Sequence, residues 1–121
     1  KEIVRATVES VAYQTHDLFE AMKNDGLRPK IIKVDGGMVK NNWFSQFLAD
    51  VVDVKVLRPK VEETTALGAA FMAGLQIGVY KSLKDISNNW QVDRTFHPRM
   101  KSSNRKNLIK GWDRAIKKTL S

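Results

Sequence analysis

The sequence predicts an α/β fold in which helices and strands alternate along a single segment of 121 residues. Three observations support this prediction. Apolar residues recur at helical spacing over long stretches, short apolar runs of strand character separate these stretches, and glycine or proline marks the junctions. The expected order is helix, strand, helix, strand, helix, then an irregular stretch and a C-terminal helix. Strand–helix–strand units of this length favour parallel strands joined by a right-handed crossover.

The first half of the chain predicts a helix, a strand and a second helix. The first helix is expected over about residues 2–23, with Gly26 supplying its C-terminal cap. Residues 31–34 form a short apolar run that is typical of a buried strand. Asn41 or Asn42 is then placed to cap the second helix. The apolar face of that helix consists of Trp43, Phe44, Phe47, Leu48, Val51 and Val52.

The next segment predicts a strand over residues 53–59 and a third helix over residues 61–78. Glu62 and Glu63 lie near the N-terminus of this helix, where carboxylates interact favourably with the helix dipole. We interpret them, with the threonines that follow, as a helix start rather than as catalytic groups. Small residues make one side of the helix slim, so we expect a neighbouring element to pack closely there. These small residues are Ala66, Ala69, Ala70, Ala73 and Gly74.

The C-terminal part predicts one helical turn capped by Ser82, an irregular loop, and a last helix over about residues 105–120. The last helix has one apolar face. It consists of Leu108, Ile109, Trp112 and Ile116. Because two strands cannot cover three apolar helices well, we expect more sheet outside this sequence. The exposed helix and sheet edge should then make the isolated segment self-associate or lose fixed packing.

Composition indicates a folded domain without cysteine chemistry. Hydrophobic residues make up 42% of the chain, and no cysteine is present, which excludes disulfides and thiolate metal sites and fits a reducing cytosol. His16 and His97 are far apart in sequence, so no metal site is predicted. No stretch approaches the ~20 apolar residues of a membrane span, and no signal peptide is visible. Lys1 is not an initiator methionine, and Val4 and Val8 already follow helical spacing, so we expect the chain to be part of a larger, cytoplasmic protein.

The positive charge is concentrated at the C-terminal end. The net charge is +8, and residues 94–121 contain nine lysines or arginines against Asp113 alone. One hypothesis is a small basic module that binds nucleic acid through phosphate neutralisation. Trp112 argues against specific nucleic-acid binding, because it falls on the apolar face of the last helix and not on a stacking surface. Near the opposite end, Tyr13, His16 and Asp17 are interpreted as a solvated or interfacial helix face rather than as a proton-transfer site.

Two adjacent glycines stand between an expected strand and an expected helix, in "VDGGMVKNN" over residues 34–42. Ligands in α/β folds bind beyond the carboxyl ends of strands, where a backbone without β-carbons can approach a phosphate closely. Gly36 and Gly37 fit that position, and Asn41 can add a directional amide contact. The alternative is a plain tight turn in which Asp35 bonds the backbone. The motif is neither GxxxxGK[ST] nor GxGxxG, so the residues alone leave both explanations open.

A resemblance over a longer stretch favours the phosphate contact over the plain turn. The stretch from "KIIKVDGGMVKNNWFSQF" to "ETTALGAAFMAG" closely resembles the C-terminal part of the glycerol kinases, in the sugar-kinase family that shares the actin and hexokinase ATPase fold. The upstream "RATVESVAYQ" and the downstream "GWDRAIKK" resemble the same family, so the resemblance covers essentially all of the chain. It implies a partial actin-like (ribonuclease H-like) ATPase domain. Residues 1–121 would form the C-terminal part of the second, nucleotide-binding domain of a larger kinase.

The resemblance also implies roles for single residues. In the family the glycine pair lines the adenosine side of the ATP cleft, which would place Gly36 and Gly37 against the nucleotide, Gly37 at its phosphates. The first asparagine, Asn41, would lie near the adenine. Asp35 would be a turn residue or a distant partner of hydrated Mg²⁺, and we favour the turn. None of the family's motifs for the catalytic base or the glycerol site occurs here, so no catalytic residue is assigned.

The resulting expectation is a segment of an ATP-dependent glycerol kinase, a cytoplasmic phosphotransferase of glycerol metabolism that uses Mg²⁺ and ATP and releases ADP. The segment alone should be inactive. Its expected partners are the N-terminal remainder of the kinase and further copies of itself in a homo-oligomer. The alternative is a kinase of the same family acting on another sugar or polyol. The basic loop "RMKSSNRKN" departs from the regulator-binding form of some family members, so we transfer no regulatory interaction.

Overall fold

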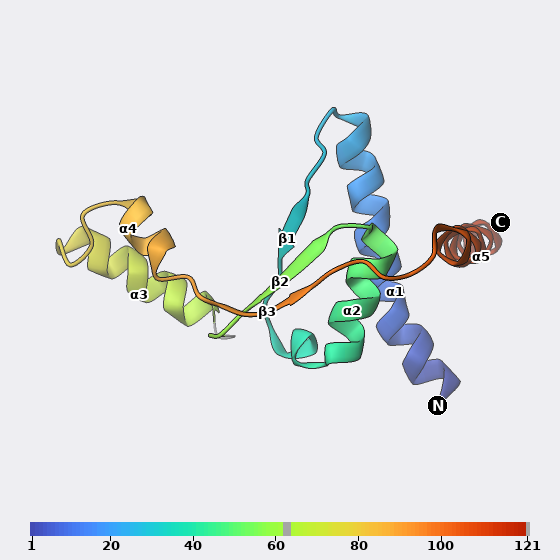
Figure 1. Ribbon diagram of the computed structural model, residues 1–121, viewed down its shortest axis with the longest axis horizontal. Helices are drawn as coiled ribbons and strands as arrows, with labels where there is room; N and C mark the ends of the chain where they lie inside the picture. The colour runs from blue at the N-terminus through green and yellow to red at the C-terminus, as the bar shows by residue number, and fades with distance from the viewer. Residues whose placement is uncertain (62–63, 121) are drawn as a thin grey trace.

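The structure is a computed structural model that describes residues 1–61 and 64–120. Helices and strands alternate over its first two thirds, which confirms the predicted α/β class and the order helix–strand–helix–strand–helix (Figure 1). The elements are α1 (Glu2–Asn24), β1 (Ile31–Lys33), the 3₁₀ helix η1 (Gly37–Lys40), α2 (Asn42–Val52), β2 (Lys55–Pro59), α3 (Thr64–Gln76), α4 (Leu83–Asn88), β3 (Val92–Phe96) and α5 (Ser102–Leu120).

The sheet is mixed, with the strand order β1-β2-β3. β1 and β2 are parallel, as predicted, with Ile32 opposite Val56. β3 is antiparallel to β2, with Phe96 opposite Val56, so the prediction of an irregular stretch at this place was wrong. The sequence hides β3 because only its last residue, Phe96, is buried, which leaves no alternation of apolar and polar residues.

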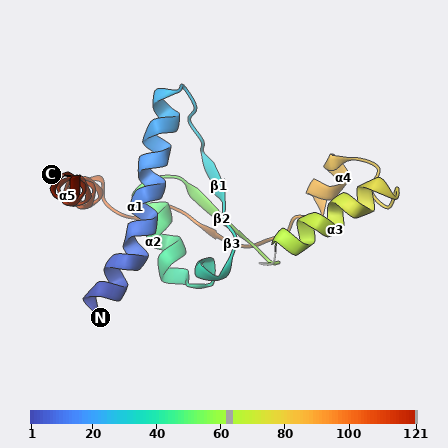
Figure 2. The ribbon, with the colours of Figure 1, turned by 180° about the vertical axis from the view of Figure 1, so that it is seen from behind.

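The helices α2 and α1 form two layers on one side of the sheet. α2 packs on β2 and β3, α1 packs on the outer side of α2, and α5 lies beyond them (Figures 1 and 2). The buried core lies mainly between these layers. It consists of Ala12, Tyr13, Phe19, Val39, Phe44, Phe47, Leu48, Ala49, Val51, Val52, Val56 and Phe96. Trp43, which was expected on the buried face of α2, is 46% exposed.

β1 is less buried than its apolar sequence predicts. Ile31 is 50% exposed, and only Ile32 packs against the core. The reason is the position of β1 at the edge of the sheet, where α2 covers β2 and β3 instead. The expectation of a buried strand is therefore wrong within this chain.

α3 and α4 lie beyond the far ends of β2 and β3, away from the helical layers (Figure 1). The alanines on the slim side of α3 are all exposed, and the neighbour expected to cover them is not an element of the described chain. Gly74 alone meets a close neighbour, since a β-carbon there would lie 2.8 Å from the Tyr80 ring. Glu62 and Glu63, expected at the start of this helix, lie outside the described residues.

The predicted helix ends are confirmed where local chemistry determines them. Gly26 has a φ of +84°, and the amides of Gly26 and Leu27 donate to the carbonyls of Lys23 and Met22, which closes α1 with a Schellman motif. Ser82 accepts from the Asp85 amide at the start of α4. α5 begins at Ser102, three residues before the predicted start. Within residues 1–61 and 64–120, none of the helices combines the length and apolarity that crossing a bilayer requires.

Candidate functional site

The structural reasons for glycine at positions 36 and 37 are different. Gly36 has φ +88° and ψ 172°, a backbone conformation open essentially to glycine alone, and it precedes η1. Gly37 begins η1 without a positive φ. A β-carbon added at either position meets no atom within 4 Å. The turn therefore explains Gly36, whereas neither the backbone nor crowding within the described chain explains Gly37.

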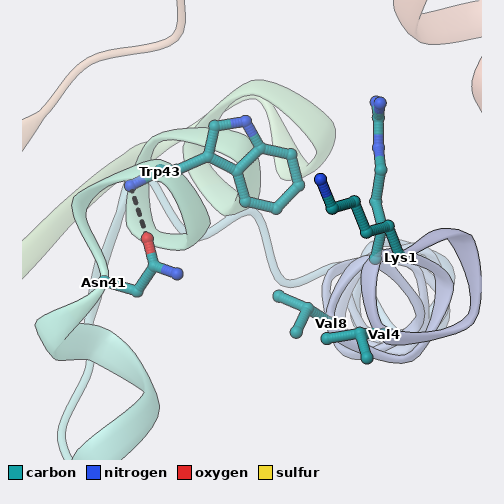
Figure 3. A pocket seen from close by; sticks show the side chains of 6 residues that line it. Lys1, Val4, Val8, Asn41 and Trp43 are labelled. Carbon is teal, nitrogen blue, oxygen red and sulfur yellow. Dashed lines mark hydrogen bonds between the residues drawn. The ribbon is translucent and has the colours of Figure 1, made fainter.

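Asn41 caps α2 and keeps one polar group available. Its Oδ1 accepts hydrogen bonds from the Trp43 amide at 2.9 Å and from the Phe44 amide at 3.3 Å. Because the cap requires the oxygen on that side, the Nδ2 group must point the other way. Figure 3 shows this nitrogen directed into the space between η1 and α1. The prediction that Asn41 or Asn42 caps the helix is confirmed, with Asn41 in that role.

η1, which joins the glycines to Asn41, is anchored in the core. The Val39 side chain is 4% exposed, and its carbonyl accepts a hydrogen bond from the buried Ser45 hydroxyl at 3.0 Å. Gly36, Gly37 and Asn41 therefore lie on one short loop with a fixed base. The three predicted nucleotide-binding residues are neighbours in space as well as in sequence.

Asp35 connects this loop to the third helix. Its Oδ2 accepts a hydrogen bond from the Thr64 hydroxyl at the start of α3. In the described part of the chain its carboxylate bonds this side chain and not a backbone amide of its own turn. This hydrogen bond therefore connects the start of α3 to the loop that follows β1, at the end of the sheet where the glycines lie.

A groove opens between α1 and the start of α2. It has a volume of about 580 Å³, within the size range of small-molecule sites. Asn41 and Trp43 line one side, and α1 lines the other (Figure 3). Its lining residues are Lys1, Val4, Arg5, Val8, Asn41 and Trp43. Tertiary packing of α1 on α2 creates this groove, and no local motif in the sequence marks it.

Tyr13 and Asp17 contact α5, which confirms the interpretation of an interfacial helix face for these two residues, whereas His16 lies 3.7 Å from Asp17 and 3.6 Å from Glu20 of its own helix. Tyr13 stacks on Trp112 with ring centroids 5.4 Å apart, and the Trp112 Nε1 donates to Asp17 Oδ2 at 2.8 Å. Trp112 packs against the core, as its place on the apolar face predicts. Burial, together with the nearby Glu9 carboxylate, raises the pKa of Tyr13 to about 12. In the described ranges, no cluster of three or more histidine, aspartate or glutamate residues could hold a metal ion.

Comparison with known proteins places this geometry in a family. Residues 1–77 match the model of the FGGY family of carbohydrate kinases, C-terminal domain. The chain is 52% identical over 122 aligned residues to a glycerol kinase of Ectopseudomonas mendocina, covering 100% of this chain and 25% of that protein.

Solved structures give the same result. The crystal structure of Plasmodium falciparum glycerol kinase with ADP superposes with a TM-score of 0.81 at 34% identity, covering 98% of this chain and 24% of that one. Gluconate kinase from Lactobacillus acidophilus shares the fold, with a TM-score of 0.72 at 23% identity over 91% of this chain and 22% of that one. The chain thus spans about a quarter of the length of these relatives. With its first 77 residues matching the C-terminal domain, the chain belongs to the FGGY family of carbohydrate kinases.

Proposed function

We propose that this chain supplies the adenosine side of the ATP cleft of a glycerol kinase, which transfers a phosphoryl group from ATP to glycerol and releases ADP and glycerol 3-phosphate. The observation that carries the proposal is Gly37. Gly37 follows the carboxyl end of β1, and its lack of a β-carbon, which serves neither a positive φ nor tight packing within the described chain, allows a ligand to approach the backbone closely there. The 52% identity to a glycerol kinase and the ADP in the Plasmodium falciparum structure support the choice of ligand.

Each site residue then has a physical task. The backbone at Gly36 and Gly37 lies against the nucleotide, with Gly37 at the phosphates. The Nδ2 group of Asn41 donates a hydrogen bond towards the adenine, while the Oδ1 of the same side chain stays engaged in the helix cap. Because the same side chain caps α2, the cap would fix the position of the adenine relative to this helix.

The described residues do not fit a Mg²⁺ site of their own. A Mg²⁺ ion takes oxygen ligands in near-octahedral geometry, and the described carboxylate next to the glycines, that of Asp35, accepts a hydrogen bond from Thr64. We therefore assign no step through the metal to this chain. In the proposed enzyme Mg²⁺ would be held by the phosphates and by residues outside residues 1–121.

The proposed enzyme requires more than this chain. Phosphoryl transfer needs several loops to position the two substrates and to stabilise charge. We expect residues 1–121 to act as the C-terminal part of the nucleotide-binding domain, with the remainder of a cytoplasmic, homo-oligomeric kinase supplying the catalytic base. The chain alone should show no glycerol-dependent ATP turnover in a coupled assay, and measurable turnover would contradict this division of labour. In the full-length protein, turnover with glycerol rather than with pentuloses tests the substrate.

An amide NMR titration of the chain with ADP tests the nucleotide site. We expect saturable shifts at Gly36, Gly37 and the Asn41 side chain. Asn41→Asp keeps the capping oxygen and removes the Nδ2 donor, so it should leave the thermal midpoint near that of the wild type and weaken ADP binding about ten-fold. Asn104→Asp on α5 is the matched control, because it makes the same chemical change at an exposed helical position away from the loop. Equal ADP affinity in the two variants would contradict the role given to Asn41.

A further inference from the structure

Arg58, on β2, holds the loop that contains the proposed nucleotide-binding residues. Its side chain is 12% exposed and contacts backbone carbonyls of η1. The Nη1 group donates to the Val39 carbonyl at 3.0 Å, to the Lys40 carbonyl at 3.2 Å and to Asn42 Oδ1 at 3.0 Å. A single guanidinium nitrogen therefore contacts residues on both sides of Asn41, two before it and one after it.

The other side of the same guanidinium is fixed by β3. Arg58 Nε and Nη2 donate to Asp93 Oδ2 at 2.8 Å and 2.6 Å. The Arg58 guanidinium carbon also lies 5.6 Å from the centre of the buried Phe96 ring. With both edges and one face occupied, the guanidinium has a single orientation, and the loop is tied to two strands of the sheet.

We propose that Arg58, oriented by Asp93, is a positioning residue for the nucleotide: it holds η1 so that Gly37 and Asn41 are presented to the ligand together. The inference rests on the proposed function. Arg58 touches the loop from the sheet side and acts on the ligand only through the loop. Lysine is a poor replacement, because its single nitrogen lacks the fork in which Nη1 faces the loop while Nε and Nη2 face Asp93.

The size of the effect follows from the population of the ordered loop. The apparent dissociation constant rises in inverse proportion to the fraction of molecules in the binding-competent conformation. If loss of the three loop bonds leaves about one molecule in ten with the loop in place, ADP binds about ten-fold more weakly. The buried Val39 side chain and its Ser45 bond still anchor the loop at its base, so the fold itself should persist.

The chain contains a matched control pair. Arg105 on α5 makes a two-bond contact with Asp53, at 2.8 Å for each bond, and its side chain is 16% exposed. This pair has the same chemistry and similar burial but does not contact η1. Arg58→Lys should weaken ADP binding about ten-fold, whereas Arg105→Lys should change it less than about two-fold. Asp93→Asn, compared with Asp53→Asn, tests the orienting carboxylate without altering Arg58.

The experiment uses the full-length protein that contains this chain and measures the ADP affinity of each variant by titration calorimetry and its thermal midpoint, with hydrogen exchange of the Val39 and Asn41 amides as the readout of loop order. Faster exchange and weaker ADP binding in Arg58→Lys and Asp93→Asn alone, at midpoints close to their controls, support the inference. If the wild type binds ADP and Arg58→Lys binds it as Arg105→Lys does, the positioning role is refuted and the nucleotide site stands. If the wild type binds no ADP, the proposed function fails, and this inference fails with it.

Discussion

The two adjacent glycines should respond in opposite ways to the same substitution. Gly36→Ala places a β-carbon on a residue with φ +88° and ψ 172°, whereas Gly37→Ala adds one where no positive φ occurs and no atom lies within 4 Å. The first change strains the backbone. The second leaves the backbone unstrained and fills the space that the nucleotide is proposed to occupy.

The magnitudes can be worked from these conformations. A non-glycine residue in the conformation of Gly36 costs about 1–3 kcal/mol of folding stability. Alanine at an unstrained position such as Gly37 instead gains about 0.4–1 kcal/mol, because it restricts the unfolded chain. The two variants should therefore differ by about 1.5–4 kcal/mol in the free energy of unfolding, with Gly36→Ala the less stable. An extra methyl group in a tight contact costs about 1–3 kcal/mol, so Gly37→Ala should bind ADP about ten-fold more weakly.

Urea unfolding measures the difference in the free energy of unfolding between the two variants. Calorimetric titration measures their affinity for ADP. Gly111→Ala on α5 is the control, since it adds a methyl group in open space far from the loop and should leave ADP binding unchanged. Undiminished ADP affinity in Gly37→Ala would refute the argument from close approach. Equal stability of the two variants would refute the argument from the backbone conformation of Gly36.

Two further predictions concern α1 and the outer surface. The folded-state pKa of Tyr13, about 12, lies above its ordinary value of 10.0, because burial and the Glu9 carboxylate disfavour the phenolate. The contribution of Tyr13 to the free energy of unfolding should therefore be complete below pH 10 and be lost as the pH rises towards 12. Urea unfolding at a series of pH values measures this loss, and Tyr13→Phe should not show it. Ile3 on α1 is 83% exposed and Ile31 on the edge strand 50% exposed, so the isolated chain should self-associate; a monodisperse monomer with a sharp cooperative melt in analytical ultracentrifugation and calorimetry would contradict this.

Local chemistry allowed much of this structure to be predicted from the sequence. Helical spacing predicted α1 and α2, Gly26 and Asn41 marked helix ends, and the glycine pair marked the turn between β1 and α2. Each of these features depends on residues within a few positions of one another, and the structure reproduces them. β3 could not be predicted in this way, because its exposed residues form a strand only by pairing with β2.

The missed strand and the missed site residue share one physical cause. The register between β2 and β3 shifts at Arg58 and Pro59, where Arg58 pairs with Arg94 and Pro59 with Val92, so Asp93 is the extra residue of a bulge. Proline has no backbone N–H to donate to the ladder, which fits an irregularity at this position. The bulge leaves Asp93 beside Arg58, and Arg58 holds the site loop. From the sequence of β2 alone, Pro59 predicts only that the strand ends there. Paired with β3, the same proline accounts for the position of the carboxylate that orients the arginine beneath the proposed nucleotide site.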